Sequence, residues 1–78
     1  MLHHSSDASD FLKGKFHTDI EVSTNTFEDS PIIFWEFQSN GATYYLLPDE
    51  SIFEKPIPPK ENDFLKEVIF PKLRKINE

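Results

Sequence analysis

The apolar positions of the chain gather in two runs that flank a turn sequence. Residues 32–38 and 42–47 are rich in aromatic and aliphatic side chains, and the dipeptide Asn40-Gly41 lies between them. Both residues of this dipeptide tolerate the positive φ angles of a type I′ turn, so the pattern predicts a tight β-hairpin. With Asn40 and Gly41 as the loop, the predicted pairs are Gln38–Thr43, Phe37–Tyr44, Glu36–Tyr45, Trp35–Leu46 and Phe34–Leu47.

The predicted hairpin carries apolar side chains on both of its faces. One face holds Ile33, Trp35, Phe37, Tyr44 and Leu46. The other face holds Ile32, Phe34, Tyr45 and Leu47, together with Glu36, Gln38 and Thr43. A sheet with one side in water normally shows polar side chains on that side. Each face of this hairpin therefore needs a cover.

Two more elements are predicted before the hairpin. Residues 16–23 alternate between apolar and polar positions, which is typical of a strand with one buried face. Residues 6–14 predict a short helix that ends at Gly14, a residue common after the last turn of a helix. Such a short helix is not stable alone, so Phe11 and Leu12 must dock against the rest of the chain.

A proline-rich connector and a second helix are predicted after the hairpin. Residues 48–60 contain several prolines, which favour an extended connector, with residues 51–54 as one helical turn or a short edge strand. Further along, apolar side chains recur at helical spacing. This spacing predicts a helix over about 62–70, followed by a kink or a break at Pro71.

These elements predict an α+β fold: a three-stranded antiparallel sheet with a C-terminal helix packed on one face and a short N-terminal helix. The three strands are expected at about 16–23, 31–38 and 42–47. We expect the C-terminal helix to cover the face that carries Trp35. The opposite face would be covered by Phe11 and Leu12, by a second copy of the chain, or by a partner. Residues 1–6 are expected to be flexible, and residues 7–78 to form a single small domain.

Composition excludes several classes of function. The 78 residues contain no Cys, which excludes disulfides, thiolate zinc sites and thiol catalysis. Only two Gly are present, so no phosphate-binding glycine loop is expected, and no catalytic or cofactor motif is found. No apolar run is long enough to span a membrane. We therefore expect a soluble cytoplasmic protein without a cofactor, and we do not expect an enzyme.

Charge is divided unevenly along the chain. The net charge is −6, and residues 16–54 contain no Lys or Arg. The acidic residues of this block are Asp19, Glu21, Glu28, Asp29, Glu36, Asp49, Glu50 and Glu54. Binding of nucleic acid requires cations that replace the counterions of the phosphates. The aromatic hairpin lies inside the acidic block, so direct nucleic-acid binding by the sheet is not expected.

The acidic block suggests a function in protein recognition. We expect a small non-catalytic interaction or regulatory protein that binds a partner with a basic surface, or forms a homodimer. The expected partner-binding residues are Asp19, Glu21, Phe34, Glu36, Tyr45 and Leu47. An acidic mimic of nucleic acid, which blocks a DNA- or RNA-binding protein, is the alternative. A plain solvated sheet face would show the same pattern of acids.

A third hypothesis concerns metal binding or acid–base chemistry. His17, Asp19 and Glu21 alternate along the predicted strand 16–23 and would project from one of its faces. An imidazole with two carboxylates is a ligand set for divalent metals and for proton transfer. The same spacing is also that of an ordinary polar strand face, and we expect no metal at this position.

Overall fold

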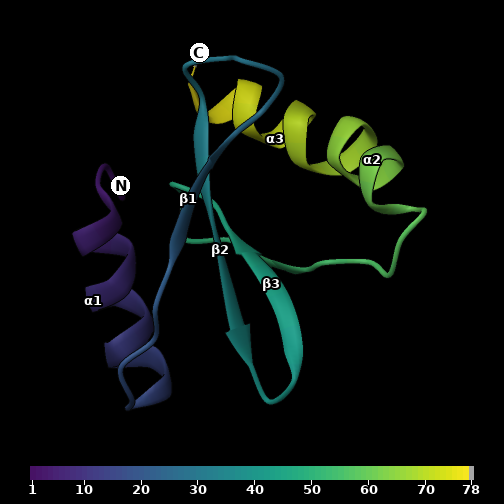
Figure 1. Ribbon diagram of the computed structural model, residues 1–78. Helices are drawn as coiled ribbons and strands as arrows, with labels where there is room; N and C mark the ends of the chain where they lie inside the picture. Colours follow the sequence, from purple (N-terminus) through teal and green to yellow (C-terminus); the bar gives the residue numbers. More distant parts are fainter. Residues whose placement is uncertain (78) are drawn as a thin grey trace.

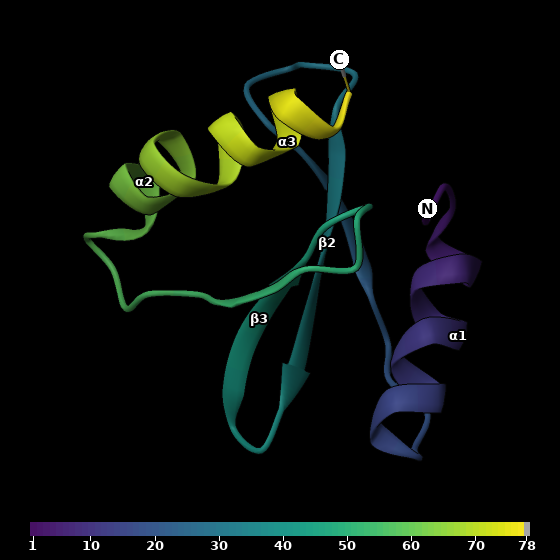
Figure 2. The same ribbon diagram turned by 180° about the vertical axis from the view of Figure 1, so that it is seen from behind.

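The computed structural model, which describes residues 1–77, has two helical layers around one sheet, and its α+β class is as predicted. The sheet is a four-stranded antiparallel meander in the order β1-β2-β3-β4. The two helices lie on opposite sides of this sheet, as both ribbon views show (Figures 1 and 2). In chain order the elements are α1 (Ser5–Phe16), β1 (Ser23–Thr26), β2 (Ile33–Ser39), β3 (Ala42–Leu46), β4 (Ile52–Glu54), α2 (Glu61–Phe64), the π-helical turn η1 (Leu65–Ile69) and α3 (Phe70–Ile76).

The β2–β3 hairpin forms at the predicted turn. Asn40 has φ 52° and Gly41 has φ 79°, the positive values that a type I′ turn needs at both central residues. The observed register contains four of the predicted pairs, and it adds Ser39–Ala42 next to the turn. The confirmed pairs are Gln38–Thr43, Phe37–Tyr44, Glu36–Tyr45 and Trp35–Leu46. The ladder ends at Trp35–Leu46, so the predicted pair Phe34–Leu47 does not form. After it the chain turns into β4, and the backbone N–H of Leu47 donates to the carbonyl of Ser51 at 2.9 Å.

The prediction of a strand over residues 16–23 is wrong. Helix α1 continues past Gly14 to Phe16, and it ends at His17, whose φ of 60° places it in the left-handed region. Strand β1 starts only at Ser23 and is made of polar residues.

Contacts with α1 explain why residues 18–22 do not join the sheet. The hydroxyl of Ser9 on α1 donates to the carbonyl of Ile20 at 3.3 Å. The side chain of Ile20 is buried in the same apolar cluster as Ala8 and Leu12 of α1. Burial against the helix therefore accounts for the alternating pattern that the sequence shows in this segment.

The two helices cover the faces of the hairpin in the opposite way to that predicted. Helix α1, through Ala8 and Leu12, packs in one cluster with Trp35, Phe37 and Leu46. The C-terminal helix, through Ile69 and Leu73, packs in a second cluster with Phe34, Tyr45 and Leu47. The N-terminal helix was one of the three covers considered for the face opposite Trp35. It does cover the hairpin, but on the face that carries Trp35.

Strand β4 explains the side on which the C-terminal helix lies. Phe53 of β4 pairs with Tyr45 of β3, and paired residues share one face of a sheet. Phe53 also contacts Phe64 at the start of the C-terminal helix, with the ring centroids 6.3 Å apart. The short connector thus returns the chain over the Phe34 and Tyr45 face. Of the two alternatives for residues 51–54, the edge strand is the one that forms, over Ile52–Glu54.

The C-terminal helix does not break at Pro71, although proline lacks an N–H and its ring clashes with the preceding helical turn. It runs from Glu61 to Ile76, with the π-helical turn η1 just before the proline. Within this turn the N–H of Phe70 donates to the carbonyl of Leu65, five residues back. The wider turn thus lies directly before the proline, whose missing N–H cannot continue the regular helical hydrogen bonds.

The first residues of the chain contact the sheet and begin α1. The N–H of Leu2 donates to the carbonyl of Pro48 at 2.9 Å, and Leu2 packs against the α1 cluster. The carboxylate of Asp7 accepts the backbone N–H groups of His3 and His4, and these two hydrogen bonds lower the pKa of Asp7. Within the described residues, no helix is long and apolar enough to cross a membrane.

Candidate functional site: an acidic groove

Three of the predicted partner-binding residues lie inside the protein. Phe34, Tyr45 and Leu47 are 3%, 1% and 0% exposed, because the C-terminal helix covers them. The rings of Phe34 and Tyr45 meet edge to face, with centroids 5.3 Å apart. These side chains therefore form part of the core, and the expectation of an exposed aromatic patch is wrong.

The other three predicted residues line one groove. Asp19, Glu21 and Glu36 lie along a hollow of about 620 Å³ between residues 18–23 and residues 36–40. Ile20 and Phe37 also border it, although both are buried in the cluster with α1. A volume of this size is within the range of sites for small ligands or short peptides.

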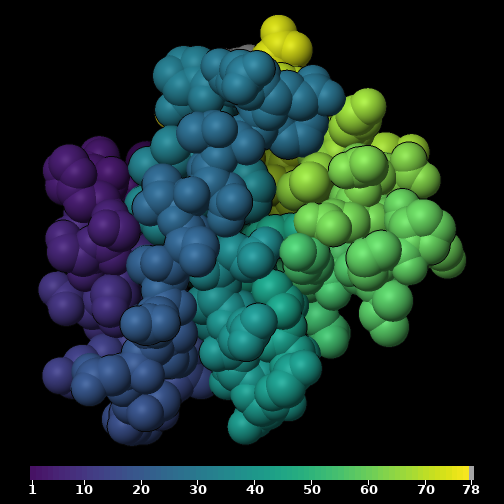
Figure 3. All heavy atoms as spheres, in the orientation of Figure 1, coloured from purple at the N-terminus to yellow at the C-terminus, as the bar shows by residue number. Residues whose placement is uncertain are grey.

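The groove exists because β1 is shorter than β2. The last pair between the two strands is Ser23–Glu36, while β2 continues to Ser39. Before Ser23 the chain lies against α1 instead of along β2, and Figure 1 shows it diverging from the lower end of β2. The space-filling view shows residues of this segment (blue) and of the hairpin (teal) side by side in the lower half of the molecule (Figure 3).

The three carboxylates of the groove differ in their partners. Asp19 forms an ion pair with Lys13 of α1 at 3.4 Å, and its side chain is 91% exposed, so solvent screens this pair strongly. Glu36 accepts from Lys55 at 3.3 Å. Glu21 is exposed and has no ion pair or side-chain hydrogen bond within the described residues. Glu21 is thus the acid in the groove that is most available to an external cation.

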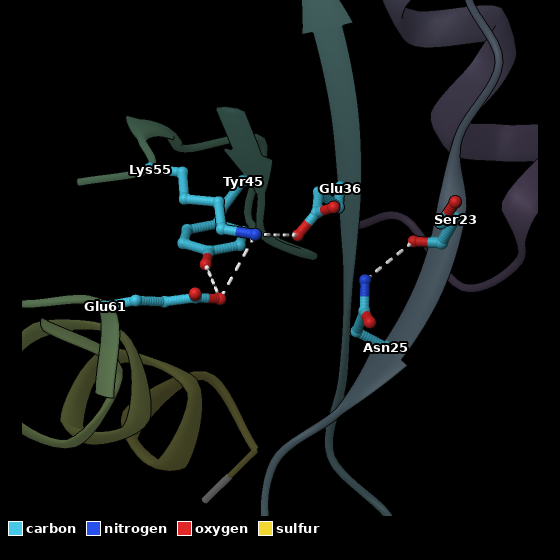
Figure 4. A network of polar contacts seen from close by, with 6 residues as sticks. All are labelled: Ser23, Asn25, Glu36, Tyr45, Lys55 and Glu61. Atoms are coloured by element: carbon cyan, nitrogen blue, oxygen red, sulfur yellow. Dashed lines mark hydrogen bonds and ion pairs between the residues drawn. The ribbon is translucent and has the colours of Figure 1, made fainter. Parts of the chain in front are cut away.

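A second polar cluster lies beside the groove and shares Glu36 with it. The ammonium of Lys55 contacts Glu36 at 3.3 Å and Glu61 at 3.2 Å, and the hydroxyl of Tyr45 donates to the same Oε1 of Glu61 at 3.1 Å (Figure 4). Burial alone would lower the pKa of Lys55, but its hydrogen bonds to Glu61 and Glu36 outweigh this effect and raise it. Burial, followed by the charge of Glu61, raises the pKa of Tyr45.

The geometry of this cluster indicates a structural clamp. Lys55 comes from the connector after β4, Glu36 from β2, and Glu61 from the first residue of the C-terminal helix. The ammonium is held protonated between two carboxylates, and the phenol of Tyr45 is held protonated as a donor. Neither group is set to exchange a proton near neutral pH, which a general acid or base requires. The cluster joins the connector and the helix to the sheet.

The residues of the metal hypothesis do not converge. His17 lies at the end of α1, and Asp19 forms an ion pair with Lys13. Among residues 1–77, no group of three or more His, Asp or Glu side chains is placed to hold a metal ion.

Sequence reasoning missed the roles of Lys55 and Glu61. A signal was present, because Lys55 is the first basic residue after the acidic block and therefore a natural partner for its acids.

Comparison of the chain with protein-family models, with curated proteins and with solved structures finds no significant match.

Proposed function

We propose that the protein is a non-catalytic binding protein that recognises a basic segment of a partner protein in the acidic groove. One observation carries this proposal: Asp19, Glu21 and Glu36, which come from two separate segments, line the same hollow. Acids that only keep a strand face in water need not converge on a concave surface. A nucleic-acid mimic would instead need carboxylates spread over the surface at the spacing of phosphates.

The groove offers a ligand mainly charge. Each exposed ion pair with a ligand contributes about 0–1 kcal/mol, so the acids supply specificity and a faster encounter rather than most of the affinity. Ile20 and Phe37 also border the hollow, but they are 9% and 2% exposed and pack in the α1 cluster, so they leave a ligand little apolar surface to bury. The preferred ligand is thus defined by its positive charge.

Fluorescence anisotropy with labelled peptides tests this proposal. The probes are a nonapeptide that alternates Val and Lys and a matched one that alternates Val and Glu. We expect the Lys peptide to bind more tightly, with an affinity that falls as salt is raised from about 20 to 150 mM, a range over which screening increases strongly.

The variant Glu21→Gln and a matched control locate the binding surface. Glu21→Gln should weaken binding of the Lys peptide several-fold. Asp29→Asn is the control, because it removes the same charge from the β1–β2 turn, outside the groove, at a φ of 61° that Asn tolerates. Equal losses in both variants, or equal binding of the two peptides, would contradict the proposal.

A further inference from the structure

The pairing of β2 shows which of its backbone groups face the groove. In an antiparallel ladder, successive residues direct their N–H and C=O groups to opposite edges. With a two-residue loop, Ser39 and Ala42 form the hydrogen-bonded pair next to the turn, so Ser39 and Phe37 bond toward β3. The backbone of Gln38 must then point to the other edge, toward the groove.

Hydrogen bonds on the far side of β3 agree with this assignment. The carbonyl of Thr43 accepts from Lys55 at 2.8 Å, and the N–H of Leu47 donates to Ser51 at 2.9 Å. The odd-numbered residues of β3 therefore bond toward β4, which leaves Ala42, Tyr44 and Leu46 to bond toward β2.

The backbone of Gln38 lacks a strand partner on the groove side. Continued by two residues, the β1–β2 register would place Glu21 opposite Gln38, but β1 begins only at Ser23. Among the described residues, no backbone hydrogen bond joins Gln38 to Glu21. Gln38 lines the groove, so the space beside this edge is not filled by the protein.

We infer that the groove binds its ligand as a short added strand that pairs with Gln38 in the sheet position that β1 leaves vacant. Such pairing supplies affinity through backbone hydrogen bonds and specificity through alternate side chains. The open part of β2 covers residues 37–39, which corresponds to roughly 10 Å of extended chain. The paired segment is therefore three or four residues long.

The faces of the sheet indicate to which side each side chain of this segment points. The choice of a basic residue among them rests on the proposed function. The ligand residue opposite Gln38 lies on the face that carries Glu36, so we assign it Lys or Arg. Its two neighbours point to the other face, where Phe37 and Ile20 are already buried against α1, so this face does not define them. The expected ligand is an extended segment of a partner protein with Lys or Arg opposite Gln38.

Amide hydrogen exchange in the free protein tests the open edge directly. The amide of Gln38 should exchange much faster than those of Phe37 and Ser39, because these two bond toward β3. The Lys peptide should slow exchange at Gln38 at least tenfold and leave its neighbours unchanged. A Gln38 amide that is already protected in the free protein would show that residues 18–22 close this edge, and would overturn the inference.

Two further changes test the backbone bond itself. Gln38→Pro removes the N–H that faces the groove, a position that a strand edge tolerates for proline, and should weaken peptide binding at least tenfold. Gln38→Ala keeps the N–H and should change binding less than threefold. Peptides that are N-methylated on alternate residues test the same bond without a protein variant. Methylation of one set of alternate residues should abolish binding, and methylation of the other set should not.

The same peptides separate this inference from the proposed function. The first probe is a nonapeptide that alternates Val and Gln. If it binds as tightly as the Lys peptide, with the same dependence on N-methylation, the added strand is supported and the charge preference is contradicted. Loss of binding in Glu21→Gln, with no effect of N-methylation or of Gln38→Pro, would retain the acidic groove and overturn the added strand.

Discussion

Replacement of Tyr45 by Phe removes one hydroxyl from the core and tests the clamp between the sheet and the C-terminal helix. The hydroxyl donates to Glu61 at 3.1 Å, and the ring is 1% exposed. A hydrogen bond to a charged group contributes about 1.5–3 kcal/mol. Glu61 keeps its contact with Lys55 and is 31% exposed to water, so we expect a loss near the lower end, about 1.5 kcal/mol, at pH 7.

The effect of Tyr45→Phe should depend on pH. Burial, then the charge of Glu61, raises the pKa of Tyr45 in the folded state above the value of about 10 in the unfolded chain. The folded state then holds the phenolic proton more tightly than the unfolded state does. The stabilisation from Tyr45 is complete below pH 10 and is lost as pH rises toward its folded pKa. The variant lacks this loss, so the stability gap between wild type and variant should narrow above pH 10.

Urea unfolding followed by far-ultraviolet circular dichroism at pH 7, 9 and 11 measures this gap. Tyr44→Phe is the matched control, because Tyr44 lies on the other face of the hairpin, stacked on Phe37 with centroids 5.4 Å apart. The raised pKa of Lys55 acts in the same direction in all three proteins, since the clamp also loses stability when that ammonium deprotonates. A gap for Tyr45→Phe that is absent at pH 7, or constant up to pH 11, would refute the clamp.

Two pairs of variants test the fold. The first pair should change the stability in opposite directions, and the second pair should differ in the fluorescence of Trp35. Gly41→Ala should destabilise by about 1 kcal/mol in urea unfolding, because Gly41 has φ 79°, whereas Gly14→Ala in α1 should stabilise by about 0.5–1 kcal/mol. The same sign for both changes would contradict the assigned turn or helix. Leu12→Ala and Leu73→Ala should each cost about 2–5 kcal/mol, since both side chains are fully buried. Only Leu12→Ala should shift the native fluorescence of Trp35 to the red, because only Leu12 shares its cluster; an equal shift in both would contradict the two separate cores.

The hairpin was predictable because its information is local. Asn40-Gly41 favours one turn type, and a two-residue loop leaves one register for the strands that leave it. The register then divides the side chains between two faces without reference to any other part of the chain. Trp35 and Tyr45 therefore fall on opposite faces, as the pairs Trp35–Leu46 and Glu36–Tyr45 require.

The failed strand shows what an alternating pattern reports. Ile20 is buried and Val22 is partly buried, while Asp19 and Glu21 are exposed, so the alternation in burial is real. The partner of the buried side chains is α1, and backbone pairing with β2 is absent before Ser23. Alternation thus indicates which side chains are covered, but it does not identify the element that covers them.

The candidate site was half predictable for a related reason. The composition of the acidic block identified Asp19, Glu21 and Glu36, and charge requires no knowledge of topology. Whether Phe34 and Tyr45 are exposed depends on which helix lies over them. Two apolar faces and two apolar helices do not decide that assignment, which follows from the short connection between β4 and the C-terminal helix.

The topology also changes the meaning of the acidic block. Four of its acids form ion pairs with lysines that lie outside it: Lys13–Asp19, Lys55–Glu36, Lys66–Glu28 and Lys72–Asp49. Both helices and the connector thus return the missing positive charge to the middle of the chain. The negative electrostatic field over the groove is accordingly weaker than the sequence suggests. Within the described residues, Glu21 is the acid of the groove that has no ion pair. A ligand that relied on charge alone would gain little there, since an exposed pair contributes about 0–1 kcal/mol. In the binding mode that we propose, the directional backbone groups of Gln38 would therefore supply the affinity, and Glu21 would select for a basic residue in the added segment.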